Sequence, residues 1–167
     1  MTGGRTWKTI IWTAAVMALL GGVLARAEDT GTDLMAGAGL AHLRRPPRLG
    51  TGSFELDHWA EDSPLGFWTS YDFIQGGAYI GLGPMARVRL GSNWILAGSS
   101  GPGYCDDKVS LNLGDRLEFR STAYLFHELG DGVRWGIAFG HYSNGGIARH
   151  NPGAEYVRIL FSIPLAI

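Results

Sequence analysis

Hydrophobic and polar side chains alternate along most of the chain after residue 30. Side chains on a β-strand point to opposite faces in turn, so alternation with period two predicts strands with one apolar face. In residues 77–90, the apolar face contains Ala78, Ile80, Leu82, Ala86, Val88 and Leu90. We predict eight strands, at about residues 33–43, 51–59, 66–73, 77–90, 94–99, 115–129, 132–144 and 155–165. A long polar loop is expected over residues 100–113.

The charged residues indicate which face of the sheet is buried. In residues 115–129 one face carries Leu117, Phe119 and Leu125, and the other carries Arg116, Glu118 and Arg120. Charges are costly against lipid but can pair inside a narrow barrel. We therefore predict an all-β fold: an eight-stranded antiparallel transmembrane β-barrel, apolar outside and charged inside. Trp59, Trp68 and Trp94 are expected to form aromatic girdles at its two interfaces.

The first residues have the layout of a secretory signal peptide. Arg5 and Lys8 precede an apolar run, and Ala25-Arg26-Ala27 resembles a cleavage site. The predicted organisation is a signal peptide at 1–27 and a barrel domain at 28–167, with no apolar run after residue 27 that could form a transmembrane helix. The alternative of a retained N-terminal anchor is weaker, because the apolar run is short for a spanning helix.

Composition and charge exclude several classes of function. The net charge is −1, and loss of the basic leader leaves an acidic chain, which argues against a nucleic-acid partner. Cys105 is the only cysteine, so an intramolecular disulfide is excluded, and we interpret it as an incidental thiol in a loop. Cysteine, histidine and aspartate show no metal-ligand spacing, so the predicted site needs no cofactor and no metal.

Three residues suited to catalysis lie at one end of the last two predicted strands. By parity, His141 and Ser143 continue the apolar face of the seventh strand, and Glu155 begins that of the eighth. With both chain ends on the periplasmic side, all three lie near the cell-surface rim and point away from the lumen. The sequence does not determine whether Glu155 is directly opposite His141 or on the diagonal.

These residue types together favour nucleophilic chemistry. Histidine can take the proton of a serine hydroxyl, and a carboxylate can orient the imidazole and stabilise its cation. Acyl transfer also requires donors for the developing oxyanion, for which Asn144, Gly145 and Gly146 are the nearest candidates. Arg149, together with His150 and Arg44-Arg45, is a candidate contact for lipid phosphates, although a solvated loop explains these charges equally well.

The stretch His141-Tyr142-Ser143-Asn144-Gly145-Gly146-Ile147, followed by Asn151-Pro152-Gly153 and Glu155, resembles the lipid A 3-O-deacylase (PagL-type) family of Gram-negative outer membranes. This resemblance implies a serine esterase in the outer membrane that removes the acyl chain ester-linked at the 3 position of lipid A in lipopolysaccharide. It also implies that Ser143 is the nucleophile, His141 the general base and Glu155 the orienting acid. The C-terminus departs from many outer-membrane proteins because it has no terminal aromatic residue.

Two other functions are compatible with the pattern. One is a non-enzymatic outer-membrane barrel, structural or adhesive, that acts through its exterior loops. The other is a soluble periplasmic barrel that holds a ligand inside, as lipocalins do. The sequence does not determine the oligomeric state, and a homodimer is compatible with it.

Overall fold

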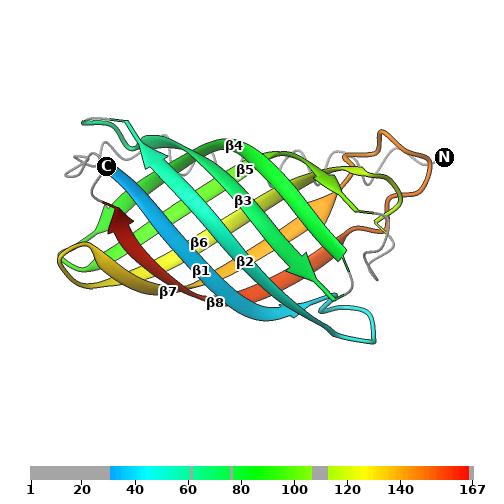
Figure 1. Cartoon of the computed structure of the whole chain (residues 1–167), viewed down its shortest axis with the longest axis horizontal. Coiled ribbons are helices and arrows are strands. Elements are labelled where there is room, and N and C mark those ends of the chain that lie inside the picture. Colours follow the sequence, from blue (N-terminus) through cyan, green and yellow to red (C-terminus); the bar gives the residue numbers. More distant parts are fainter. Residues whose placement is uncertain (1–30, 61, 76, 107–112, 166–167) are drawn as a thin grey trace.

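Eight antiparallel strands close into a barrel (Figure 1). The computed structural model describes residues 31–60, 62–75, 77–106 and 113–165. The strands are β1 (Gly31–Ala41), β2 (Leu49–Trp59), β3 (Leu65–Ile74), β4 (Gly77–Leu90), β5 (Trp94–Cys105), β6 (Leu117–Gly130), β7 (Val133–Ser143) and β8 (Ala154–Leu165). Each pairs with its neighbour in sequence, and β8 pairs with β1, which leaves no open sheet edge. The predicted fold class is confirmed. None of the described residues forms a helix long and apolar enough to cross a membrane.

The two ends of the barrel carry different connections. The β1–β2, β3–β4, β5–β6 and β7–β8 connections lie at one end, here called the distal end. The β2–β3, β4–β5 and β6–β7 turns lie at the other, the proximal end, where β1 begins and β8 ends (Figure 1). The predicted signal peptide lies outside the described residues, and so does residue 28, where the predicted barrel domain begins.

The strand limits follow the alternation closely, with one larger difference at β5. Residues 77–90 form β4 as predicted, but β5 continues six residues past its predicted end to Cys105. Glycines 101 and 103 permit this extension, because a Cβ at Gly101 would lie 2.1 Å from the Leu82 carbonyl oxygen and one at Gly103 would lie 2.3 Å from the Tyr79 ring. Cys105 therefore ends a strand, buried, and is not a loop residue as expected.

The outside of the barrel is apolar and the lumen is polar. Outward positions on β2, β4 and β8 include Phe54, Ile80 and Ile159, which are 54%, 55% and 70% exposed. Inside, Arg120 pairs with Glu55 and Asp72, and Arg134 pairs with Asp33 at 2.6 Å. This arrangement suits a barrel surrounded by lipid. The exposed apolar side chains can then contact lipid, and the charges in the lumen are paired with counterions.

Three residues do not lie where the sequence predicted. Trp59 and Trp68 face the lumen and are 5% and 0% exposed, so they belong to no outer girdle. There the guanidinium groups of Arg87 and Arg120 stack on their rings at 4.1 and 3.9 Å from the centroids. Arg116 precedes β6 and is exposed, with its Nη1 donating to the Tyr104 hydroxyl at 3.1 Å, so only Glu118 and Arg120 of that charge set lie inside. Trp94, 42% exposed, does face outward.

Candidate functional site

The register of β7 and β8 places His141 directly opposite Glu155. The Nδ1 atom of His141 lies 3.8 Å from Oε1 of Glu155. This distance is longer than a hydrogen bond but needs only a small side-chain adjustment to become one. The pairing across the two strands is direct, one of the two arrangements that the sequence left open.

Ser143 follows two residues after His141 on the same face of β7. That face also carries Ile137 and Phe139, which are 49% and 52% exposed on the outside of the barrel. Ser143 itself is 6% exposed and is paired with Phe119 of β6. Within the described part of the chain, no hydrogen bond joins its hydroxyl to the His141 ring. The three residues thus share the outer face at the distal end, without a closed chain of hydrogen bonds.

Glu155 has a second cationic partner in the β1–β2 connection. Nη1 of Arg44 lies 3.2 Å from Oε1, the same oxygen that faces His141. The backbone holds this connection against β8, since the N–H of His42 donates to the Glu155 carbonyl oxygen at 2.8 Å. The Arg44 side chain is 78% exposed, whereas that of Glu155 is 15% exposed. Glu155 is therefore shared between an exposed surface cation and the imidazole.

A row of polar side chains continues from His141 across the outer surface. Ser121 of β6 is paired with His141, and Ser100 of β5 is paired with Ser121. The two serine hydroxyls lie 2.9 Å apart. Neither serine was predicted as a site residue, because the two come from separate strands and only the register aligns them with His141. The available signal was the outward parity of Ser121, which lies between the apolar Phe119 and Ala123 on the same face.

The Asn144 side chain is fully buried and holds two connections together. Its Nδ2 donates to the carbonyl oxygens of His150 at 2.8 Å and Leu113 at 3.4 Å, and its Oδ1 accepts from Gly146 N–H at 3.0 Å. Its own backbone N–H donates to the Asn151 side chain at 3.2 Å. These bonds occupy the amide groups of Asn144 and Gly146, two of the three predicted oxyanion donors.

Gly145 and Arg149 lie in the exposed part of the β7–β8 loop. Gly145 and Gly146 have φ values of 65° and 83°, a conformation that favours glycine and turns the chain sharply after Asn144. Among the described residues, the Gly145 N–H has no hydrogen-bond partner, so it is the predicted oxyanion donor that is available. The role of Arg149 in phosphate contact stays a prediction.

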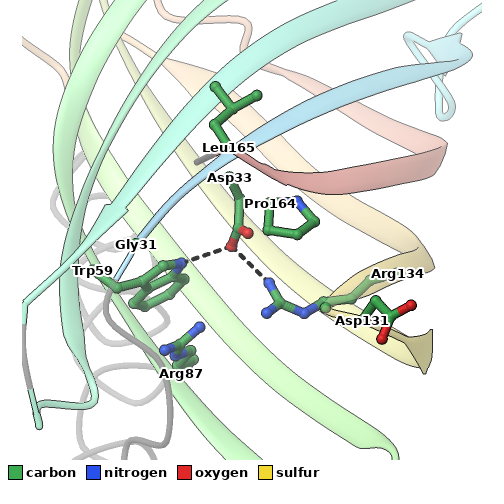
Figure 2. Close-up of a pocket in the computed structure, with 9 residues that line it drawn as sticks. Gly31, Asp33, Trp59, Arg87, Asp131, Arg134, Pro164 and Leu165 are labelled. Atoms are coloured by element: carbon green, nitrogen blue, oxygen red, sulfur yellow. Dashed lines mark hydrogen bonds and ion pairs between the residues drawn. The ribbon is translucent and has the colours of Figure 1, made fainter. Parts of the chain in front are cut away.

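A separate pocket lies at the proximal end, far from these residues along the strands. It has a volume of about 180 Å³ and is lined by Gly31, Asp33, Trp59, Arg87, Asp131, Gly132, Arg134, Pro164 and Leu165. Figure 2 shows the Asp33 carboxylate between the Trp59 indole and the Arg134 guanidinium, which donate to it at 3.0 and 2.6 Å. These partners satisfy the Asp33 carboxylate, and the second carboxylate of the lining, Asp131, is exposed to solvent. No group of three or more potential metal ligands occurs among the residues the structure describes.

Comparison with known proteins identifies relatives of this chain in sequence and in fold. A sequence-family model described as lipid A 3-O-deacylase (PagL) matches residues 47–164. The crystal structure of the outer membrane enzyme PagL is similar, with a TM-score of 0.64 and 19% identity, covering 80% of this chain and 99% of that one.

Two other solved barrels are also similar in fold. A de novo designed transmembrane β-barrel has a TM-score of 0.61 and 8% identity, covering 84% of this chain and 99% of its own. Neisserial surface protein A has a TM-score of 0.57 and 8% identity, covering 80% and 96%. Identities this low indicate a shared fold only. No curated protein matches the sequence.

Proposed function

The chain belongs to the lipid A 3-O-deacylase (PagL) family, and we propose that it hydrolyses the ester-linked acyl chain at the 3 position of lipid A by a Ser143–His141–Glu155 mechanism. The observation that carries this proposal is the pairing of His141 with Glu155 across β7 and β8, with Ser143 on the same outer face. Each of these polar groups is costly beside lipid, so their convergence on an apolar surface favours a functional role.

The proposed reaction begins with Ser143 as nucleophile. Its Oγ attacks the ester carbonyl carbon of lipid A while the His141 imidazole takes the hydroxyl proton. The imidazolium then gives that proton to the 3-oxygen of the sugar as the C–O bond breaks, which leaves an acyl-serine. Water, deprotonated by His141, attacks this ester and releases the fatty acid. We assign the oxyanion to the Gly145 N–H, because it has no other hydrogen-bond partner among the described residues.

Two small side-chain movements would assemble this arrangement. The Glu155 carboxylate must approach Nδ1 of His141 from 3.8 Å to hydrogen-bond distance, and the Ser143 hydroxyl must turn toward the other ring nitrogen. Catalytic hydrogen bonds are commonly long before substrate binds and shorten in the complex. Glu155 would then neutralise the imidazolium that forms during proton transfer.

The position of the site suits a substrate that lies in a bilayer. Below His141, the outward face of β7 presents Phe139, Ile137 and Trp135 to lipid, and the acyl chains of lipid A can lie along them. We place the barrel in a bacterial outer membrane with the distal end at the cell surface, where the outer leaflet supplies lipid A. An active site outside the lumen fits this arrangement, because the lumen is filled by buried charged side chains.

The direct test measures fatty acid release from lipopolysaccharide by the purified protein in detergent. Wild-type protein is expected to release a 3-hydroxy fatty acid, whereas Ser143→Ala and His141→Asn should abolish release and still form the barrel. Ser92→Ala and His58→Asn are matched controls, since both residues lie at the proximal end, Ser92 in the β4–β5 turn and His58 on β2. Release that persists in the Ser143→Ala and His141→Asn variants would refute the mechanism.

The same measurement separates the alternatives. A structural or adhesive barrel would release no fatty acid, and the lipid A mass spectrum of cells that express it would be unchanged. A soluble ligand-binding barrel would remain in solution without detergent, which the exposed Phe54, Ile80 and Ile159 oppose.

A further inference from the structure

We propose that Gly153 is a positioning residue for the His141 imidazole, and that the absence of a side chain at this position sets where the ring lies. Gly153 is the second residue before Glu155, just ahead of β8. This inference rests on the proposed function, because the ring is placed for the hydrolysis described above. In addition to the three proposed catalytic residues, the backbone of Gly153 would then restrict the position of the His141 ring along one edge.

The contact between Gly153 and the ring is tight. A Cβ built at Gly153 would lie 2.7 Å from Cε1 and 2.9 Å from Nε2 of His141. Carbon atoms in ordinary contact are separated by about 3.5 Å or more. Gly153 therefore faces the Cε1–Nε2 edge of the ring, whereas Nδ1 is the nitrogen that lies 3.8 Å from Oε1 of Glu155. The imidazole therefore contacts two residues at the start of β8, Glu155 near Nδ1 and Gly153 near Nε2.

A methyl group at this position would displace the ring and not the backbone. The same Cβ would also lie 3.2 Å from the Tyr142 carbonyl oxygen, so backbone atoms crowd it as well as the imidazole. The imidazole turns on two rotatable bonds, whereas Tyr142 is fixed by the β7 ladder. To bring Cε1 from 2.7 Å to an ordinary contact of about 3.5 Å the ring must move by roughly 0.8 Å. Such a change disturbs catalysis more than folding.

Gly153 also has a left-handed backbone conformation, with φ of 61°. Substitution by alanine therefore adds backbone strain as well as the ring contact, and the two effects must be separated. Gly91 provides the matched control. It has φ of 75°, lies in the β4–β5 turn, and has nothing within 4 Å of its built Cβ. Gly91→Ala introduces the strain without any contact.

The first measurement compares G153A and G91A with wild type in the lipopolysaccharide assay. We expect kcat of G153A to fall on the order of 100-fold, as is typical for catalytic groups displaced by about 1 Å, with KM changed by less than about threefold. G91A should keep wild-type kcat. Equal losses in both variants would overturn the inference, because strain alone would then explain them. Full activity of G153A would also overturn it.

The second measurement observes the ring directly and does not depend on activity. Nitrogen-15 labelled histidine in detergent micelles gives imidazole resonances, and the His141→Asn variant identifies those of His141. We expect the His141 resonances and their pH titration to move in G153A and to stay unchanged in G91A. An unmoved His141 signal in G153A would overturn the inference, and so would failure of G153A to form a heat-modifiable barrel, since Gly153 would then be structural. If wild type releases no fatty acid, the proposed function fails, and a moved His141 signal still supports the contact.

Discussion

Replacement of Arg120 by methionine tests whether the charged lumen holds the barrel together. The Arg120 side chain is 1% exposed, and its Nη1 donates to Asp72 at 3.3 Å while its Nη2 donates to Glu55. Nη2 also donates to the Tyr124 hydroxyl at 3.3 Å. Methionine fills similar volume but removes the charge and every donor, so the variant loses the two ion pairs together with the Tyr124 hydrogen bond and the stacking on Trp68.

The magnitude depends on which carboxylate loses its partner. Asp72 keeps Arg158, whose Nη1 lies 3.4 Å away, and it keeps the Tyr142 hydroxyl. Glu55 keeps no cation in the part of the chain that the structure describes, but it keeps the Tyr124 hydroxyl, at 2.8 Å. A buried charge that loses its counterion typically costs about 3–5 kcal/mol. We expect Arg120→Met to lower the free energy of unfolding by about this amount, mainly through Glu55.

The assay is equilibrium urea unfolding in lipid vesicles, followed by tryptophan fluorescence and by heat-modifiable electrophoresis. The double variant Arg120→Met/Glu55→Gln removes the orphaned charge as well, so it should recover a large part of the lost stability. Arg149→Ala in the exposed loop is the control and should change the unfolding free energy by less than about 0.5 kcal/mol. A loss below about 1 kcal/mol for Arg120→Met, or a double variant less stable than the single, would refute the reasoning.

Two further predictions concern the connections around the site. Asn144→Ala removes the bonds to His150, Leu113 and Gly146, each worth about 1 kcal/mol, so hydrogen exchange at the Gly146 amide should accelerate on the order of 10–100-fold while amides in the middle of β7 keep their protection. Unchanged exchange at Gly146 would contradict the anchoring role. Arg44→Gln removes an exposed ion pair, so it should change the unfolding free energy by less than about 1 kcal/mol and kcat/KM by less than about fivefold. A larger loss of kcat/KM would indicate that Arg44 itself binds the substrate.

The alternation of side chains predicted the fold because it is a local property of each strand. The outward stripe of β7 through Ile137 and Phe139 could be recognised without any partner strand. The same parity placed His141 and Ser143 on the outside. The β5 extension was not predictable in this way, because Gly101 and Gly103 resemble loop residues until Leu82 and Tyr79 are seen packed against them.

The tryptophans illustrate a second limit. Trp59 and Trp68 are of the residue type that is common in interface girdles. Their parity on the strands and their contacts with Arg87 and Arg120 nevertheless place them in the lumen. The orientation of a side chain on a strand follows from parity, whereas residue type alone carries only a tendency. A strict count of parity along β2 and β3 would have predicted these two positions.

The sequence by itself determined that this chain forms an eight-stranded barrel with an apolar exterior, and that a histidine, a serine and a glutamate lie at its distal rim. Period-two alternation encodes these features residue by residue. Only the tertiary structure decided the register that pairs His141 with Glu155, the alignment of Ser121 and Ser100 beside them, and the contact of Gly153 with the ring. Those features depend on the register between paired strands, which is established when the barrel closes. The pattern within a single strand contains no information about that register.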